Sequence, residues 1–158
     1  YSGGKSAASY EEVSSGKTGH AESVQIRFDP RKISYGQILR IFFSVALNPT
    51  ELNRQGPDFG TRYRAEIFYA NETQRHVAES YIAQLDQAHA FDRPIVTRVD
   101  PLTGFYPAEA YHQDYLLQHP DNPYIVINDL PKVANLKRLF PMVSRDTPVT
   151  VAAAHSSL

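Results

Sequence analysis

The chain contains no cysteine and no tryptophan, and only one methionine, among its 158 residues. The absence of cysteine excludes disulfides, thiolate metal sites and a cysteine nucleophile from these residues. It does not fix the cellular compartment, because a cysteine-free chain survives in both oxidising and reducing surroundings. The sequence opens on Tyr1 without an initiator methionine and shows no signal-peptide pattern. We therefore expect that an amino-terminal segment has been removed or left out.

Long apolar runs and a strong charge imbalance are missing as well. The longest apolar stretch, residues 38–47, contains Arg40 and is too short to span a membrane. A formal net charge of -1 gives no reason to expect nucleic acid or an anionic membrane as a partner. The 6 histidines show no metal-ligand spacing, so we expect no metal site.

What remains is the composition of an ordinary soluble domain, with 42% hydrophobic and 21% charged residues. This length is sufficient for one domain with a proper core. We predict a single domain over residues 1–142 and a disordered tail over residues 143–158, where no packing pattern exists. A soluble protein is expected, with the cytoplasm favoured over the periplasm.

The first quarter of the chain is predicted as a loop followed by a strand. Residues 1–21 are predicted to be loop. In residues 22–28 Val24, Ile26 and Phe28 alternate with polar residues, which predicts a half-buried strand.

Capping boxes predict where two helices begin. Ser34 with Gln37 opens a helix that ends before Asn48, and Asn71 with Gln74 opens a second helix. The other elements are predicted as an irregular functional segment at residues 48–63, strands at 64–69 and 94–99, a short helix at 108–118, a brief apolar run at 124–127, and a final helix capped by Asn128 or Asp129 with Pro131 in its first turn. This alternation indicates a two-layer α/β or α+β domain.

The segment from Tyr10 to Glu22 carries the candidate chemistry. It combines a tyrosine, two glycines, a histidine and carboxylates without hydrophobic periodicity. Glu22 is predicted where this loop enters a sheet, a position at which a side chain can be held and aimed. Judged by residue type alone, Glu22 is more often a solvated glutamate. Gly16-Lys17-Thr18 is not a phosphate loop, since a strand and not a helix is predicted after it.

Three sequence blocks lie in order over residues 1–118. They contain Tyr1-Ser2-Gly3-Gly4 with Ser9-Tyr10-Glu11-Glu12-Val13 and Ser15-Gly16-Lys17-Thr18-Gly19-His20-Ala21-Glu22; Leu52-Asn53-Arg54-Gln55-Gly56-Pro57-Asp58-Phe59-Gly60-Thr61-Arg62-Tyr63-Arg64; and Phe105-Tyr106-Pro107-Ala108-Glu109 with Tyr111-His112-Gln113-Asp114-Tyr115. Together these blocks resemble the A-type peptide methionine sulfoxide reductases, which reduce the S epimer of methionine sulfoxide. The resemblance implies an α+β fold, a two-layer mixed sheet flanked by helices with a ferredoxin-like core. The first strand and helix of that family would lie upstream of Tyr1, and without them the fold would expose a hydrophobic face.

The resemblance also implies roles for four residues. Glu22 matches the catalytic glutamate of the family, which protonates the sulfoxide oxygen, and Tyr10 and Tyr63 match the tyrosines that bind this oxygen. Asp58 matches an aspartate that helps to bind substrate and an ordered water. A buried carboxylic acid with a raised pKa suits proton donation, so we expect Glu22 to be largely buried and to converge with both tyrosine hydroxyls. Without the resemblance the tyrosines would be packing residues and Asp58 a turn residue.

The sequence departs from the family at the nucleophile. The Gly-Cys-Phe-Trp-Gly motif and the resolving cysteine are both absent, so we expect the nucleophilic cysteine upstream of Tyr1 and no reductase activity in the chain as given. The implied function is thiol-dependent reduction of methionine S-sulfoxide, free or in proteins, as repair of oxidative damage. No bound cofactor is expected; thioredoxin or another thiol would be the external reductant, and a monomer is expected.

Two alternatives stay open at this point. The first is a non-catalytic fragment or paralogue that binds methionine sulfoxide or a peptide containing it. The second is an acid–base hydrolase using Glu22 and His20, which has no support beyond the residue types. We expect His20 to be a structural loop histidine, because no partner carboxylate is evident.

Overall fold

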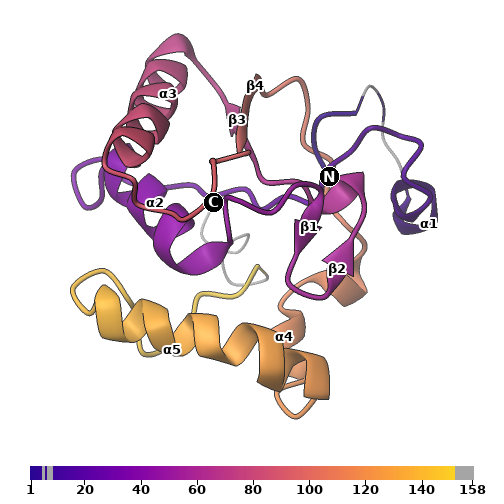
Figure 1. The fold of residues 1–158 in the computed structure, drawn as a ribbon. Coiled ribbons are helices and arrows are strands. Elements are labelled where there is room, and N and C mark those ends of the chain that lie inside the picture. Colours follow the sequence, from indigo (N-terminus) through magenta and orange to yellow (C-terminus); the bar gives the residue numbers. More distant parts are fainter. Residues whose placement is uncertain (5, 7–8, 152–158) are drawn as a thin grey trace. The chain divides into compact units, whose positions relative to one another are not determined.

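The computed structural model describes residues 1–4, 6 and 9–151 (Figure 1). The chain divides into two compact units, Tyr1–Pro107 and Ala108–Leu158, and each is described by itself below. All four candidate site residues belong to the first unit. The predicted single domain over residues 1–142 stays a prediction, and so does the disordered tail, of which residues 152–158 lie outside the described residues.

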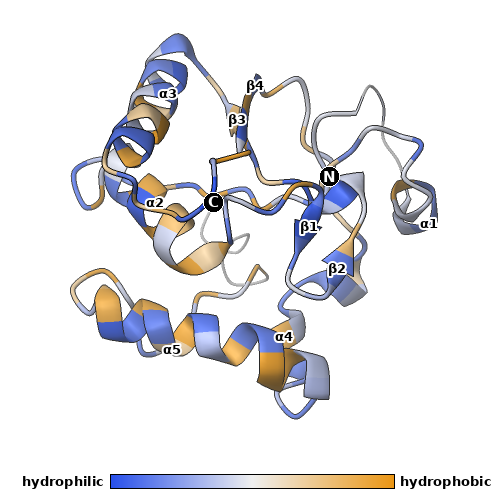
Figure 2. Ribbon diagram, viewed as in Figure 1, coloured by the Kyte–Doolittle hydropathy of each residue, from blue (hydrophilic) through white to orange (hydrophobic). Residues whose placement is uncertain are grey.

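The core of the first unit is built by two helices and two parallel strands. Helix α3 (Glu72–Gln87) connects β3 (Glu66–Tyr69) to β4 (Arg98–Pro101) and packs on both strands and on α2 (Tyr35–Ile41). The side chains that meet there are apolar: Leu39, Phe43, Ile67 and Ala78 are buried, and Tyr35, Tyr81, Ile82, Leu85 and Val99 pack around them. Figure 2 shows hydrophobic and hydrophilic residues alternating around α3, as expected of a helix with one buried side.

The predicted helix starts are confirmed, but the first helix does not continue as predicted. Ser34 and Gln37 form a full capping box, whereas Asn71 accepts from the Gln74 amide at 3.0 Å without a reciprocal bond. After Ile41 the helix widens into a π-helical turn, η1 (Phe42–Ala46). Such a turn has one more residue per hydrogen-bonded ring than an α-helix, and hydrophobic periodicity alone does not distinguish the two.

The two parallel strands have different faces. Glu66 lies opposite Arg98, and Phe68 lies opposite Asp100. Because side chains alternate along a strand, these four residues share one face, while Ile67 joins the core on the other face. The strand predicted at 64–69 is confirmed with a later start, and the strand predicted at 94–99 begins only at Arg98.

The segment predicted as irregular, residues 48–63, contains a small hairpin. Strands β1 (Arg54–Gln55) and β2 (Asp58–Phe59) pair antiparallel around Gly56, whose φ of 57° suits glycine. A 3-10 turn, η2 (Thr61–Tyr63), follows directly. The hairpin and turn thereby bring Asp58 and Tyr63 into one compact loop.

The prediction of a half-buried strand at residues 22–28 is wrong. This stretch has no strand assignment, and Val24 and Ile26 are 87% and 58% exposed. A segment in which apolar and polar residues alternate forms a strand only where a neighbouring strand supplies hydrogen bonds and a packed layer covers one face. None of the strands among the described residues pairs with this stretch.

The prediction that residues 1–21 are entirely loop is also wrong. This stretch contains one short helix, α1 (Tyr10–Ser14), and Ser9 and Glu12 form a capping box at its start. Gly16 then adopts a φ of 72° just after the last turn, where glycine avoids the steric cost of a Cβ. Short helices of this kind have too few residues to show hydrophobic periodicity.

The second unit consists of helical turns and one longer helix. Its elements are η3 (Ala110–His112), α4 (Tyr115–Gln118), the π-helical η4 (Ile125–Asp129) and α5 (Leu130–Leu139). The single helix predicted at 108–118 is wrong, because Asp114, with a φ of 54°, interrupts it. Helix α5 follows Asp129 and has Pro131 in its first turn, as predicted, although no side chain caps it.

None of the helices in the described part of the chain combines the length and the apolar character needed to cross a membrane.

Candidate functional site

Arg62 and Glu22 are joined through both backbone and side chain. The Glu22 amide donates to the Arg62 carbonyl at 2.9 Å, and Arg62 Nε lies 3.4 Å from Glu22 Oε1. The turn η2 therefore holds the end of the Tyr10–Glu22 loop and also neutralises its carboxylate. Arg62 was not among the residues predicted from the sequence, although its place next to Tyr63 in the second sequence block pointed to it.

Tyr63 lies against the same guanidinium. Arg62 Cζ is 4.6 Å from the centroid of the Tyr63 ring, a cation–π distance. A side-chain hydrogen bond with Tyr63 raises the pKa of Arg62. Burial raises the pKa of Tyr63, and the charges of Glu22 and Asp58 act in the same direction. Tyr63 therefore keeps its proton at neutral pH and is available as a hydrogen-bond donor.

Tyr10 and Asp58 are near this pair. Arg62 Nη1 donates at 2.6 Å to the carbonyl of Ser14, the last residue of the helix that Tyr10 begins. Tyr10 contributes to the electrostatic environment of Arg62, as Asp58 does to that of Tyr63. The structure thus brings Glu22 and Tyr63 together at Arg62, and it places Tyr10 on the helix whose last residue binds the same guanidinium. Convergence of Glu22, Tyr10 and Tyr63 on one oxygen atom stays a prediction.

The expectation that Glu22 is largely buried is wrong, because its side chain is 38% exposed. The reason is the neighbouring stretch, residues 23–28, which lies open to solvent instead of forming a covered strand. Glu22 is held by Arg62 and not by an apolar pocket among the described residues. Its ion pair with Arg62 favours the ionised carboxylate, whereas the predicted role as a proton donor requires the acid form.

His20 is buried between aromatic rings. The residue is 2% exposed, and its ring lies edge-on to the rings of Tyr1 and Tyr106, with centroids 6.4 and 5.7 Å away. A Cβ on Gly4 would lie 2.2 Å from His20 Cε1, so the loop packs directly on the ring. Burial lowers the pKa of His20, which favours the neutral form. These surroundings suit a structural histidine better than a general base.

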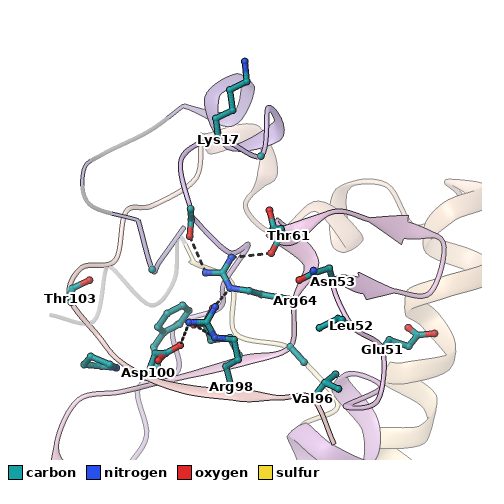
Figure 3. A pocket seen from close by; sticks show the side chains of 17 residues that line it. Lys17, Glu51, Leu52, Asn53, Thr61, Arg64, Val96, Arg98, Asp100 and Thr103 are labelled. Carbon is teal, nitrogen blue, oxygen red and sulfur yellow. Dashed lines mark hydrogen bonds and ion pairs between the residues drawn. The ribbon is translucent and has the colours of Figure 1, made fainter. Parts of the chain in front are cut away.

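A cavity of about 710 Å³ lies on the charged face of β3 and β4 (Figure 3). Arg64, Glu66, Arg98 and Asp100 are among its lining residues, and none of the four predicted site residues is. Burial raises the pKa of Glu66 to about 7, and a hydrogen bond with Asp100 acts in the same direction. This charged cluster was not predicted from the sequence. The one indication of it there was a glutamate, Glu66, in the middle of a predicted strand.

No set of metal ligands is found in the part of the chain that the structure describes. No group of three or more His, Cys, Asp or Glu side chains there is placed to hold a metal ion. The expectation that the protein binds no metal stays a prediction.

Comparison with known proteins gives consistent matches. A family model described as "Peptide methionine sulfoxide reductase" matches residues 1–142. "Peptide methionine sulfoxide reductase MsrA 2" of Mesorhizobium japonicum is 58% identical over 155 residues, which are 98% of this chain and 80% of that protein. The resemblance noted from three sequence blocks is therefore confirmed over nearly the whole chain.

Two solved structures share the fold. Mxr1 from Saccharomyces cerevisiae in reduced form matches with a TM-score of 0.67 at 32% identity, over 72% of this chain and 61% of that chain. Methionine sulfoxide reductase A of Corynebacterium diphtheriae matches with a TM-score of 0.63 at 30% identity, over 77% of this chain and 62% of that chain. These matches confirm the predicted α+β class. This chain spans less than two thirds of either solved chain.

Proposed function

The chain belongs to the peptide methionine sulfoxide reductase family, and from this we propose that it supplies the oxygen-binding part of a thiol-dependent reduction of methionine S-sulfoxide. The substrate would be methionine sulfoxide, free or within proteins, and the product methionine. Membership makes the protein an oxidoreductase by class. The proposal concerns what these 158 residues contribute to the reaction.

The geometry supports a division of labour around the sulfoxide oxygen. Glu22 donates the proton that this oxygen needs as the sulfur accepts electrons. Tyr63 and Tyr10 donate hydrogen bonds to the oxygen without adding charge, and Asp58 supports the site through a water molecule. Arg62 orients Glu22 through the two contacts described above, at 2.9 and 3.4 Å.

The attacking sulfur has to come from outside these residues, since none of them is cysteine. In the proposed sequence, a cysteine thiolate upstream of Tyr1 attacks the sulfoxide sulfur while Glu22 protonates the oxygen. The hydroxyl group then moves from the methionine sulfur to the cysteine sulfur as the bond between the two sulfurs breaks, which releases methionine and leaves the cysteine as a sulfenic acid. Two equivalents of an external thiol, such as the two thiols of thioredoxin, then reduce the sulfenic acid to a thiol, yielding water and a disulfide.

One observation carries this proposal: Glu22 and Tyr63, predicted as proton donor and oxygen ligand, both contact the side chain of Arg62. Chain segments about forty residues apart are thereby brought to one point. Packing alone would not require a glutamate and a tyrosine to share one guanidinium. The complete absence of cysteine supports a second candidate, a fragment that binds methionine sulfoxide without turnover.

The experiment that separates these candidates uses the longest reading frame containing this chain. If that protein includes a Gly-Cys-Phe-Trp motif before Tyr1 and reduces methionine S-sulfoxide with dithiothreitol, the enzyme assignment stands. A reading frame that begins near Tyr1, with sulfoxide binding but no turnover, would support the binder instead.

A further inference from the structure

Arg64 connects the two segments that carry the proposed acid and one proposed oxygen ligand. Its Nη2 donates to the Gly19 carbonyl at 3.0 Å, and its Nη1 donates to the His20 carbonyl at 3.1 Å. Nη1 also donates to the Thr61 carbonyl at 3.0 Å. One guanidinium therefore ties the loop before Glu22 to the turn that contains Tyr63.

The guanidinium is fixed on its other side by a buried carboxylate. Arg64 Nε forms an ion pair with Glu66 Oε2, and the two side chains are only 10% and 2% exposed. Glu66 is itself held from β4, since Arg98 Nε lies 3.9 Å from Glu66 Oε1 and Arg98 Nη2 lies 2.7 Å from Asp100 Oδ2. In Figure 3 the Arg64 side chain lies between Thr61 and Arg98, with Asp100 beside Arg98.

The chain approaches Arg64 closely from a third direction. A Cβ on Gly3 would lie 2.7 Å from Arg64 Nη2 and 3.0 Å from Phe68 Cζ. Gly3 also has a φ of 89°, which disfavours any other residue. The guanidinium therefore occupies a space shaped by three separate segments, and this limits the positions it can adopt.

We propose that Arg64 is a positioning residue for sulfoxide reduction: anchored by Glu66, it fixes the carbonyls of Gly19 and His20 and thereby holds Glu22 beside Tyr63. This inference rests on the proposed function for its catalytic consequence. Its structural part, the fixing of the Glu22 loop, can be measured without any activity. Lysine cannot replace arginine here, because an ammonium group lacks the planar fork that reaches three carbonyls and a carboxylate.

The first arm of the test measures amide hydrogen exchange at pH 8 in the 158-residue chain. Arg64→Lys keeps the charge that pairs with Glu66 but removes the fork. We expect the Glu22 amide to exchange roughly tenfold faster or more, while amides in α3 are unchanged, because local openings are governed separately from global unfolding. Arg75→Gln, which removes an exposed ion pair with Glu72 at 3.1 Å, is the matched control and should change neither.

Glu66→Gln is the second variant and keeps the test decisive if Arg64→Lys does not fold. The variant leaves the guanidinium but weakens its anchor, so the Glu22 amide should exchange faster, by less than in Arg64→Lys. The α3 amides should be unchanged, because Glu66 lies on the face of β3 opposite to that of Ile67, which packs in the core with Ala78 of α3. An unchanged Glu22 amide in the variants that fold, or an equal rise in Glu22 and α3, would overturn the positioning role.

The second arm uses a longer, cysteine-containing form of the protein, which the proposed function requires, with methionine S-sulfoxide. Arg64→Lys should lower kcat roughly tenfold or more with little change in KM, because the acid is misplaced in the chemical step while binding persists. A rise in KM with kcat unchanged, or no change in either constant, would contradict the inference. If the wild-type protein shows no reduction at all, the proposed function fails, and the exchange arm still decides whether Arg64 fixes the Glu22 loop.

Discussion

Arg62 holds Glu22 by two groups at once, its carbonyl accepting the Glu22 amide at 2.9 Å and its Nε lying 3.4 Å from the Glu22 carboxylate. A carboxylate held in this way has a defined direction even though it is partly open to solvent. The pair is worth little as a stabilising interaction, at most about 1 kcal/mol, because the Glu22 side chain is 38% exposed to water. The contribution of the Arg62–Glu22 pair is to fix the position of Glu22 relative to Tyr63.

Glu22→Gln in the cysteine-containing protein should slow sulfoxide reduction by roughly 10²- to 10⁴-fold, the usual cost of losing general acid catalysis. The amide still donates a hydrogen bond to the oxygen but transfers no proton, so substrate binding should persist. Single-turnover kinetics with methionine S-sulfoxide measure this step. Rates equal to those of the wild-type protein would exclude Glu22 as the proton donor.

Arg62→Gln should lower kcat/KM by roughly 10- to 100-fold, because a small misplacement of a catalytic group is costly in rate. The free energy of unfolding should fall by roughly 1–3 kcal/mol, because Arg62 is only 21% exposed and its Nη1 also donates to the Ser14 carbonyl at 2.6 Å. Arg75→Gln removes a comparable surface pair and serves as the control for both measurements. Equal activity in the two variants would mean that Arg62 does not orient Glu22.

The sequence predicted the parts of this fold in which local pattern and tertiary packing agree. The capped helix α3 and strand β3 are of this kind, since their apolar residues, such as Ala78 and Ile67, are buried by each other. The strand expected at residues 22–28 failed because its alternating pattern needs a neighbouring strand, and no strand among the described residues pairs with it. The alternating pattern of one segment does not show whether another strand lies beside it.

Only part of the candidate site could be predicted from the sequence. Glu22, Tyr10, Tyr63 and Asp58 were identified through the family resemblance, and the structure brings Glu22 and Tyr63 together at Arg62. Their surroundings were not predictable, and the expected burial of Glu22 was wrong at 38% exposure. An arginine is usually solvated, so residue type gave no reason to select Arg62, in the predicted irregular segment, or Arg64, at the start of a predicted strand.

The exposed apolar residues at 24 and 26 should contribute almost nothing to the stability of the 158-residue chain. Val24→Ser and Ile26→Ser should each change the free energy of unfolding by no more than about 0.5 kcal/mol, as for other surface sites. Leu39→Ala, in the core at 3% exposure, should cost about 2–5 kcal/mol. Urea unfolding at neutral pH measures all three, and a large loss in Val24→Ser would mean that this stretch is packed.

Glu66 should make the protein less stable as the pH rises from about 4.5 to 7. Its pKa is raised from 4.5 to about 7 in the folded chain, so the unfolded chain releases this proton first within that window. The effect is at most about 3 kcal/mol, since a pKa change of one is worth about 1.4 kcal/mol. His20 acts in the opposite direction, because its lowered pKa costs stability as the pH falls below 6.5.

The contribution of Glu66 is therefore measured as a difference. Arg64, Arg98 and Asp100 face its carboxyl, and the lowered pKa of Asp100 places its titration below that window. The free energy of unfolding of the wild-type chain minus that of Glu66→Gln should decrease between about pH 4.5 and about pH 8 and then become constant, because half of the folded molecules still carry the Glu66 proton at the folded-state pKa of about 7. A difference independent of pH would show that Glu66 titrates normally.

The central claim is that these residues provide the acid and the oxygen ligands of a sulfoxide reductase but not its nucleophile. The most direct measurement is turnover of methionine S-sulfoxide with dithiothreitol, by the 158-residue chain and by the longer cysteine-containing protein. The account predicts no turnover above the thiol-only background for the chain and clear turnover for the longer protein, because only a thiolate forms the sulfenic acid intermediate. Enzyme-dependent turnover by the chain alone, or none by the longer protein, would contradict it.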